Sequence, residues 1–330
     1  MAKIFLVTGG TGFLGSALVK KLLANGDEVR ILDNNSRGSM RRLSGLESNV
    51  NVISGDCRSL DTMLKASQGV DCIVHMAAVN GTKFFYTHPE LVLDVAVRGM
   101  LAVVDACKAN DIGEIIVASS SETYQTPTHV PTPECVPLVV PDVLNPRYSY
   151  GGGKIISELI AMNYSRQNFD RVVIFRPHNV YGPDMGWEHV IPEFSVRAVK
   201  LIDQNHSGVV KFPIKGDGTQ TRSFIYIDDF VDGLMRVMDK GSHQAIYNIG
   251  TEEEVSIAAL ASKVFSCLGK EINLQTSAAP TGETNRRCPD IAKLRALGFR
   301  QRVSLEEGLR ETVGWYANNF NLIESAFKPQ

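Results

Sequence analysis

The sequence has few cysteines and no long apolar segment, and neither sign of charge predominates. Its 330 residues include 6 cysteines, which are widely scattered and form no C-x-x-C pair. This pattern argues against a disulfide framework or a zinc site and favours reduced thiols in a cytoplasmic protein. No uninterrupted apolar run approaches the roughly 18 residues of a membrane span. The first residues lead at once into a strand-like run, so we also expect no signal peptide.

The charge balance excludes a further class of partner. Lys and Arg total 34 against 36 Asp and Glu, which gives a formal net charge of -2. Nucleic-acid binders usually present a basic face to phosphates, so we expect no nucleic-acid partner. None of the 7 histidines has metal-ligand spacing to another, and we therefore expect no metal. The hydrophobic content of 44% is ample for a core and argues against intrinsic disorder.

The first 175 residues alternate short apolar, β-branched runs with longer helix-like stretches, a pattern typical of a parallel sheet flanked by helices. The expected strands are 4–8, 28–33, 50–54, 72–76, 115–119 and 171–176, and expected helices are 12–25 and 89–110. Beyond residue 176, prolines and glycine-containing turns divide the chain into shorter elements. The later expectations are strands at 224–227 and 245–249 and helices at 256–268 and 305–318.

These elements predict an α/β fold with two domains. Residues 1–175 are expected to form a Rossmann-like, doubly wound parallel sheet that also carries the catalytic residues. Residues 176–330 are expected to form a smaller C-terminal α/β substrate domain, of which some segments, for example around 211–240, return to the first domain. Ligands of such sheets bind at the carboxyl ends of the strands.

A glycine-rich segment, residues 9–15 (GGTGFLG), follows the first expected strand and opens a helix. Glycines at this spacing let the backbone approach a pyrophosphate, which then lies at the helix N-terminus. Asp33 ends the second strand about 20 residues after the last glycine, where a carboxylate accepts hydrogen bonds from ribose hydroxyls and repels a 2′-phosphate. We therefore predict NAD as the cofactor, and Arg37 keeps NADP as the alternative.

Asp56 follows the third strand and has two interpretations. It either accepts a hydrogen bond from the adenine amino group or serves as a turn residue at the strand end. The residues that we expect to contact the cofactor are Gly9, Gly12, Phe13, Leu14, Asp33, Asp56, Tyr150 and Lys154.

Tyr150 and Lys154 are separated by three glycines and fall on one face of an expected helix. A nearby ammonium favours the phenolate, so we expect it to lower the tyrosine pKa and allow Tyr150 to act as a base. Each helical glycine costs about 1 kcal/mol relative to alanine, and we expect a bound cofactor or sugar to need the empty volume. Serines 119–121 and Glu122 follow the fifth strand, where a hydroxyl can donate to a substrate oxygen and the carboxylate can act as a second acid or base.

Taken in this order, the glycine loop, the aspartate, the serines and Tyr-x-x-x-Lys resemble the extended short-chain dehydrogenase/reductase family. Residues 176–183 (RPHNVYGP) are similar to its R-x-x-N-x-Y-G-P segment, and residues 221–229 (TRSFIYIDD) to its T-R-x-F-x-Y-V-x-D segment. Both are typical of the branch that modifies nucleotide-diphosphate sugars. The resemblance implies a tightly held NAD that oxidises a sugar carbon, usually C4, to a ketone and is later reduced again. It also implies a homodimer formed through two helices of the first domain.

The resemblance implies roles for individual residues. Tyr150 is the base that removes the sugar hydroxyl proton, Lys154 supports it and binds the cofactor ribose, and Ser120 takes the place of the family's Ser/Thr. The expected catalytic residues are Ser120, Tyr150, Lys154 and Glu122. The expected substrate-binding residues are Ser121 (also the alternative to Ser120), Asn179, Arg222 and one of Arg286 and Arg287, with the arginines on the diphosphate.

The particular reaction is less strongly indicated. Residues 120–122 resemble the corresponding segment of sugar 4,6-dehydratases and glucuronate decarboxylases, and residues 286–290 also resemble the decarboxylases, whereas residues 176–179 are closer to epimerase-like members. We predict C4 epimerisation of a nucleotide-diphosphate sugar, with 4,6-dehydration or UDP-glucuronate decarboxylation as the alternatives. An alternative of another class is a non-catalytic, NAD-binding regulatory protein.

Overall fold

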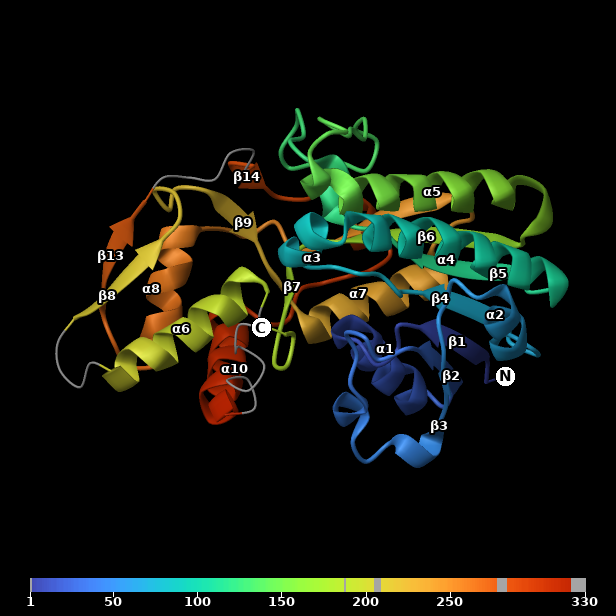
Figure 1. Cartoon of the computed structure of the whole chain (residues 1–330), viewed down its shortest axis with the longest axis horizontal. Coiled ribbons are helices and arrows are strands. Elements are labelled where there is room, and N and C mark those ends of the chain that lie inside the picture. Colours follow the sequence, from blue (N-terminus) through green and yellow to red (C-terminus); the bar gives the residue numbers. More distant parts are fainter. Residues whose placement is uncertain (1, 187, 205–208, 278–283, 322–330) are drawn as a thin grey trace.

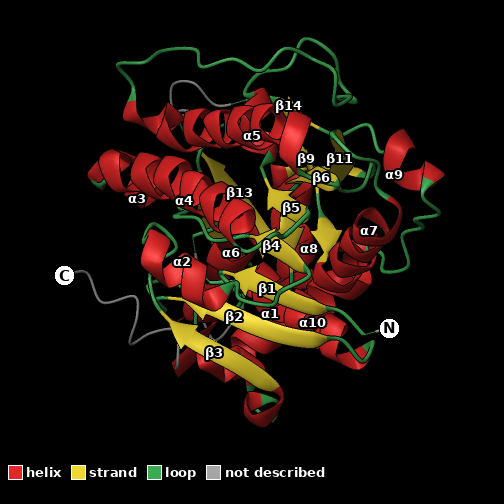
Figure 2. Ribbon diagram, turned by 90° about the vertical axis from the view of Figure 1, so that its right-hand side faces the viewer, coloured by secondary structure: helices red, strands yellow, loops and turns green. Residues whose placement is uncertain are grey.

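A seven-stranded parallel sheet forms the centre of the larger of two lobes (Figures 1 and 2). The computed structural model describes residues 2–321 except 187, 205–208 and 278–283. The strand order is β11-β6-β5-β4-β1-β2-β3, and all neighbouring pairs are parallel. The strands are β1 (Ile4–Thr8), β2 (Glu28–Asp33), β3 (Val50–Ser54), β4 (Cys72–His75), β5 (Glu114–Ala118), β6 (Arg171–Pro177) and β11 (Ala245–Ile249).

Helices cover both faces of this sheet (Figure 2). One hydrophobic core joins the sheet to α1 (Phe13–Ala24), α7 (Ile227–Lys240) and α9 (Ala292–Ala296). A second core, on the opposite face, joins it to α2 (Leu60–Ala66), α4 (Pro89–Ala109) and α5 (Ser149–Asn168). Strands buried between two helical layers need apolar side chains on both faces, which is why their sequences read as continuous rather than alternating apolar runs.

The smaller lobe has a core of its own, formed by aromatic and aliphatic side chains. Its helices are α6 (Val190–Gln204), α8 (Ile257–Cys267) and α10 (Leu305–Asn318). Its short strands pair as β8 (Val210–Ile214) with β13 (Ile272–Thr276), β9 (Thr221–Ser223) with β12 (Glu254–Ser256) and β14 (Arg286–Arg287), and β7 (Val180–Tyr181) with β10 (Ile225–Tyr226). None of the helices in the described part of the chain combines the length and apolar character that a bilayer crossing requires.

The predicted α/β, doubly wound class is confirmed, and the strands of the first 175 residues lie within one residue of their expected ends. The expected helices at 256–268 and 305–318 correspond to α8 and α10, which begin after side-chain caps from Ser256 and Ser304. The expected strand at 224–227 is present but shorter, because β10 covers only Ile225–Tyr226 and α7 begins at Ile227. Asp228 and Asp229 lie in the first turn of α7, where carboxylates complement the helix dipole.

The chain passes between the lobes more than once. After β7 and β10 it returns to the larger lobe through α7 and β11, which complete the sheet, and later through α9. β8, by contrast, lies in the smaller lobe, although it belongs to the segment around 211–240 that was expected to return. The smaller lobe is therefore assembled from separate segments of the sequence.

Two of the three glycines of α5 have reasons within the protein itself. A Cβ on Gly151 would lie 2.8 Å from the carbonyl oxygen of Glu122, and one on Gly153 would lie 2.9 Å from the Cβ of Ala96 in α4. At Gly152 the nearest side-chain atom, on Val140, would be at an ordinary 3.5 Å. Close approach of neighbouring segments therefore accounts for Gly151 and Gly153, whereas the expectation that a bound ligand needs the space stays a prediction at Gly152.

This difference predicts opposite effects of two adjacent substitutions. Gly153→Ala should lower the free energy of unfolding by about 1–3 kcal/mol, because the new methyl group overpacks the contact between α5 and α4. Gly152→Ala should raise it by about 0.5–1 kcal/mol, because alanine is the better helix former and has room. Urea denaturation followed by circular dichroism measures both. Equal effects of the two variants would contradict this explanation.

Candidate active site

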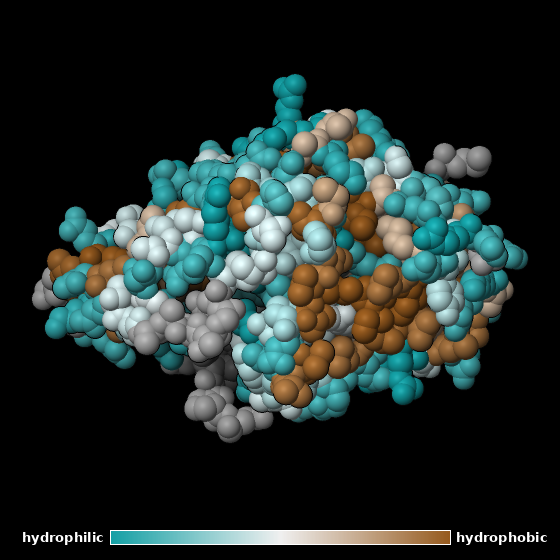
Figure 3. Space-filling view, turned by 90° about the horizontal axis from the view of Figure 1, so that it is seen from above, coloured by the Kyte–Doolittle hydropathy of each residue, from teal (hydrophilic) through white to brown (hydrophobic). Residues whose placement is uncertain are grey.

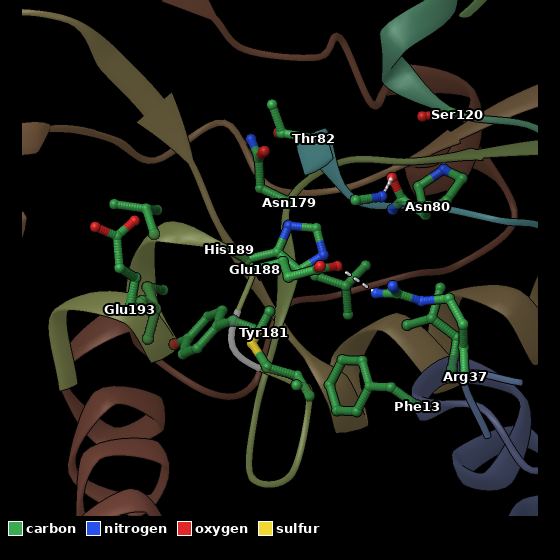
Figure 4. A pocket seen from close by; sticks show the side chains of 18 of the residues that line it. Phe13, Arg37, Asn80, Thr82, Ser120, Asn179, Tyr181, Glu188, His189 and Glu193 are labelled. Atoms are coloured by element: carbon green, nitrogen blue, oxygen red, sulfur yellow. Dashed lines mark hydrogen bonds and ion pairs between the residues drawn. The ribbon is translucent and has the colours of Figure 1, made fainter. Parts of the chain in front are cut away.

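A cavity of about 1590 Å³ lies between the two lobes and is lined by residues from both (Figure 4). The larger lobe contributes the glycine loop, the segments after β2 and β4, the end of β5, and the start of α5. The smaller lobe contributes the segment after β7, the first turns of α6, and parts of β8 and β9. The cavity therefore adjoins the carboxyl ends of β1, β4 and β5, where doubly wound sheets bind their ligands.

The glycine loop is shaped for close approach of backbone to a ligand. Gly9 has φ +73°, which favours glycine, and a Cβ there would lie 2.9 Å from the backbone of Ala77. Gly12 is the N-cap of α1, and Phe13 and Leu14 line the cavity in the first turn of that helix. Free backbone N–H groups at a helix N-terminus suit a pyrophosphate, and the residues present fit a dinucleotide.

The two expected aspartates have different surroundings. The buried carboxylate of Asp33 accepts hydrogen bonds from the backbone N–H of Thr11 at 3.0 Å and of Asn35 at 2.8 Å, so it braces the glycine loop. Each of its oxygens keeps a second lone pair for a further donor. Asp56 forms an ion pair with Arg58 at 2.6 Å, and this pairing lowers the pKa of Asp56.

Tyr150, Lys154 and Ser120 meet at the cavity, as the sequence predicts. Tyr150 is buried, and its ring stacks on Phe85 with centroids 5.2 Å apart. The Lys154 ammonium lies 6.0 Å from the centre of the Tyr150 ring and donates to the carbonyl oxygen of Ala118 at 2.7 Å. Ser120 caps the short helix η3 (Ser121–Tyr124), and Ser121 also lines the cavity.

The sequence led us to expect a lowered pKa for Tyr150, and for the protein without a bound cofactor this expectation is wrong. Burial raises the pKa of Tyr150 to about 12, although its interaction with the Ser120 hydroxyl acts in the opposite direction. Burial also lowers the pKa of Lys154 to about 8, which leaves most of it protonated at neutral pH. The site therefore holds a cation near a neutral phenol in a dry environment, where an added positive charge has a strong effect on the phenol.

Glu122 is held in its ionised form by Arg287. Burial by itself would raise the pKa of Glu122, but the Arg287 guanidinium, which forms a two-point ion pair with the carboxylate, brings the pKa below its ordinary value. Arg147 and Arg222 lower this pKa further. Glu122 therefore lies at the cavity as a carboxylate and not as a carboxylic acid.

The arginines expected on the diphosphate do not share one location. Arg286 and Arg287 form β14, in which consecutive side chains point to opposite sides. Arg286 is half exposed and pairs with Glu254, whereas Arg287 is directed to Glu122 beside the catalytic residues. Arg222 lines the cavity and donates to the carbonyl oxygen of Thr221 at 2.8 Å. Asn179 also lines it and donates to the carbonyl oxygen of Ser223 at 2.9 Å.

Ion pairs across the cavity were not foreseen from the sequence. Arg37 reaches from the segment after β2 to Glu188 in the smaller lobe, at 2.5 Å (Figure 4). Arg41 and Arg42 pair with Asp184 at 2.7 Å and 3.4 Å. Nothing in the local sequence distinguishes these arginines from surface residues, because their partners lie more than 140 positions away. Together they connect the loop beside the cofactor region to the substrate lobe.

A buried ion pair lies behind the catalytic residues. Arg176, at the end of β6, contacts Glu158 of α5 through two hydrogen bonds of 2.6 Å and 2.8 Å, and the two side chains are 2% and 6% exposed. Ser119 also donates to Glu158, and Arg176 donates to the hydroxyl of Tyr124 at 2.7 Å. The pair thus connects α5, the end of β5, η3 and β6. Arg176 belongs to the R-x-x-N-x-Y-G-P segment, but that pattern did not reveal its partner.

Comparison with known proteins assigns this fold and site to a family. The sequence matches the NAD dependent epimerase/dehydratase family over residues 5–250. A putative UDP-glucose 4-epimerase of Methanocaldococcus jannaschii is 30% identical over 96% of this chain and 99% of its own length. A UDP-N-acetyl-alpha-D-glucosaminuronate decarboxylase of Bacillus cytotoxicus is 30% identical over 96% of this chain and 98% of its own. The crystal structure of DesIV, a dTDP-glucose 4,6-dehydratase of Streptomyces venezuelae with NAD and TYD bound, superposes on this chain with a TM-score of 0.86. The two sequences are 29% identical, and the superposition covers 98% of this chain and 99% of that one.

The chain therefore belongs to the NAD-dependent epimerase/dehydratase family. The relatives named above are members of this family that act on nucleotide sugars. This result confirms the resemblance to extended short-chain dehydrogenases/reductases and NAD as the cofactor. The similar proteins catalyse different reactions, so the comparison supports the nucleotide-sugar class and not one activity within it. No three histidine, cysteine, aspartate or glutamate side chains of the described residues are grouped so that they could hold a metal ion.

Burial of Lys154 gives a testable effect on stability. Because the folded state lowers its pKa from 10.5 to about 8, the unfolded chain binds the proton more tightly between these pH values. The free energy of unfolding of the wild type should therefore increase as the pH rises from about 8 to about 10.5. Below pH 8, Lys154→Met should be more stable than the wild type by about 1–3 kcal/mol, and this gain should shrink above pH 8.

Thermal and urea unfolding of both proteins at pH 7 and pH 10 measures this effect. If Lys154 has the role that the family resemblance implies, the substitution should also abolish turnover. A destabilised Lys154→Met protein at pH 7 would show that the hydrogen bond from Lys154 to Ala118 outweighs the burial of its charge.

Proposed function

We propose that this protein is an NAD-dependent epimerase that inverts C4 of a nucleotide-diphosphate sugar through a transient 4-keto intermediate. The meeting of Ser120, Tyr150 and Lys154 beside the glycine loop supports an oxidation and reduction at one sugar carbon. NAD, when bound, accepts a hydride from that carbon and later returns it. Tight retention of NAD follows from this recycling, because the cofactor ends each turnover in the form in which it began.

The chain's own residues handle the proton and the oxygen. Tyr150 accepts the C4 hydroxyl proton, and the protonated Lys154 stabilises the phenolate that precedes this step. The Ser120 hydroxyl donates a hydrogen bond to the substrate oxygen as it changes between alkoxide and carbonyl. For the second half of the reaction, the ketone turns its other face toward the cofactor, and Tyr150 returns the proton. Asn179 and Arg222 hold the sugar diphosphate at the far side of the cavity.

The ion pair between Arg287 and Glu122 is the observation that supports epimerisation over dehydration. Elimination of water requires an acid that protonates the departing hydroxyl group. Glu122 lies next to the catalytic serine, but its ion pair with Arg287 keeps the proton off its carboxylate at neutral pH. Epimerisation at C4 needs no proton donor other than Tyr150. The roles proposed for Glu122 and Arg287 are therefore orientation and charge, and not acid catalysis.

Decarboxylation is the second candidate, because it also needs no acid for a leaving hydroxyl group. The arrangement of Glu122 and Arg287 beside Ser120 supports it, and so does the similarity to the Bacillus cytotoxicus decarboxylase. Mass spectrometry of the products from a panel of nucleotide sugars separates the reactions. An epimerase gives an isomer of unchanged mass, whereas loss of water or of carbon dioxide would contradict our proposal. Binding of NAD without any turnover would instead indicate a regulatory protein.

Replacing the proposed base tests the mechanism directly. Tyr150→Phe should lower kcat by at least about 10²–10⁴-fold, because it removes the group proposed to accept the hydroxyl proton. Fluorescence titration of the variant with NADH should give a dissociation constant close to that of the wild type, since the phenyl ring keeps the stacking on Phe85. Retained activity in Tyr150→Phe would mean that another residue is the base.

We propose a homodimer formed through α4 and α5. Hydrophobic side chains gather on the face of the molecule that carries these helices (Figure 3). Leu93 of α4 is 37% exposed, and Ile156 and Leu159 of α5 are 40% and 57% exposed. Exposed apolar groups that adjoin one another on two packed helices are typical of a protein–protein interface.

Leu159→Arg should convert this dimer to a monomer, because it places a charge in the apolar interface. Sedimentation equilibrium measures the mass in solution. Val209→Arg is the matched control, since Val209 is 58% exposed but lies in the smaller lobe. A wild-type monomer, or a Leu159→Arg protein that remains dimeric, would contradict the proposal.

A further inference from the structure

Gln125 has a backbone conformation that residues with a side chain rarely adopt. It directly follows η3 and has φ +51° and ψ -108°. These angles match the first central position of a type II′ turn, which glycine dominates because a Cβ is crowded by the backbone there. Gln125 is also buried. A residue other than glycine keeps such a conformation where the surrounding structure holds it in place, and such residues cluster at functional sites.

Hydrogen bonds on both sides hold Gln125 in this conformation. Its side-chain Nε2 donates to the carbonyl oxygen of Glu122 at 2.6 Å. Its own carbonyl oxygen accepts a hydrogen bond from the buried hydroxyl of Thr284 at 3.2 Å. Thr284 precedes β14 in the smaller lobe, whereas η3 belongs to the larger lobe, so the second bond crosses from one lobe to the other.

The start of α5 leaves room for the Gln125 amide. A Cβ on Gly151 would lie 2.5 Å from the Nε2 of Gln125, so the amide occupies the space that a side chain at this position would need. Gly151 directly follows Tyr150 in α5. The end of η3, the first turn of α5 and the segment before β14 therefore meet at one side chain.

Two of these segments also supply the ion pair beside the catalytic residues. Glu122 belongs to η3 and Arg287 to β14, and their side chains make the two-point contact described above. The hydroxyl of Thr284, which donates to Gln125, also accepts a hydrogen bond from the Arg287 guanidinium at 3.4 Å. Gln125 thus holds the backbone of the carboxylate through its amide, and the segment of the guanidinium through its carbonyl oxygen.

We propose that Gln125 is a positioning residue that keeps Glu122 and Arg287 in contact across the two lobes. Without its amide, the carbonyl oxygen of Glu122 loses this donor, and the backbone at Gln125 can return to an ordinary conformation. That change turns the carbonyl oxygen of residue 125 away from Thr284 and loosens the segment that leads to Arg287. The consequence for turnover rests on the proposed function, in which the Glu122–Arg287 pair orients the substrate.

The protonation state of Glu122 reports this contact in the protein without substrate. Burial acts to raise the pKa of Glu122, and the cations around it lower that pKa. The charged and titratable groups that face it are Arg287 of β14, Arg222 of β9, Arg147 of η4 (Pro146–Tyr148), Tyr150 of α5 and His189 just before α6. A weaker contact with Arg287 leaves the burial in place, so the pKa of Glu122 should rise.

Carbon-13 NMR of Gln125→Met measures this change, because methionine has a similar volume and no donor. In protein labelled at the glutamate side-chain carboxyl carbons, the resonance that is missing from Glu122→Gln belongs to Glu122. Its titration midpoint should rise by roughly 1–3 pH units in Gln125→Met relative to the wild type. An unchanged midpoint would overturn the inference.

Gln244→Met is the matched control. Gln244 also has a positive φ, of 56°, and its Nε2 donates to the carbonyl oxygen of Met162 in α5. It does not line the cavity. Gln244→Met should leave the Glu122 midpoint unchanged, and an equal rise in both variants would show a general structural effect and overturn the inference.

A second pair of variants tests whether the backbone is strained. Gln125→Gly and Gln125→Ala both lack the amide, but alanine retains the cost of a positive φ. The thermal unfolding midpoint of Gln125→Gly should therefore be higher than that of Gln125→Ala by roughly 1–4 °C. Equal midpoints would show that no strain is held at this position and would overturn the inference.

Turnover separates the inference from the proposed function. If both hold, kcat of Gln125→Met should fall roughly 10- to 100-fold, while its dissociation constant for NADH stays that of the wild type. The expected NMR change in a protein whose wild type converts no nucleotide sugar would uphold the inference and overturn the proposed function. The NMR change with an undiminished kcat would uphold the contact and overturn the part that the proposed function gives to Glu122 and Arg287.

Discussion

The buried ion pair between Arg176 and Glu158 is the interaction on which the geometry of the site depends. Two charges removed from water must satisfy one another, and breaking such a pair by removing one partner typically costs about 3–5 kcal/mol. Glu158 belongs to the same helix as Tyr150 and Lys154, and its second partner, Ser119, precedes Ser120. The direction of α5 and the end of β5 are therefore fixed by a single carboxylate. In the proposed mechanism the phenol, the ammonium and the serine hydroxyl act on one substrate atom, and this shared carboxylate holds their segments together.

Charges elsewhere in the cavity divide into those that are neutralised and those that are left for a ligand. The ion pairs of Arg37 and Arg41 connect the two lobes, and Arg287 determines the protonation state of Glu122. A net charge of -2 does not prevent the proposed binding of a nucleotide sugar, because other arginines also line the cavity. A few cationic side chains that line a cavity are enough to attract an anion, because their electric field is concentrated in the cavity and not spread over a surface.

The sequence predicts the larger lobe and the grouping of Ser120, Tyr150 and Lys154 at one cavity well, because both depend on local patterns. Apolar runs identify the strands. The glycine loop directly follows the end of a strand, and Tyr-x-x-x-Lys lies within about one turn of a single helix. The missed features depend on the distant parts of the chain that fold against them. Glu158 meets Arg176 only because α5 packs on β6, and the pKa of Tyr150 rises because its ring is buried, in part beneath Phe85 of α3 (Thr82–Thr87). The direction of Arg287 likewise follows from the pairing of β14 with β9.

The discontinuous smaller lobe has a consequence for how such proteins diversify. Its parts come from before α7, after β11 and after α9, and each part is separated from the next by a segment that completes the larger lobe. No single cut in the gene separates the residues that select the sugar from those that bind NAD. Recombination between related genes would therefore break the sheet before it exchanged the selecting residues as a block. In this architecture a point substitution at the cavity, by contrast, can change the lining of the site while the sheet stays intact.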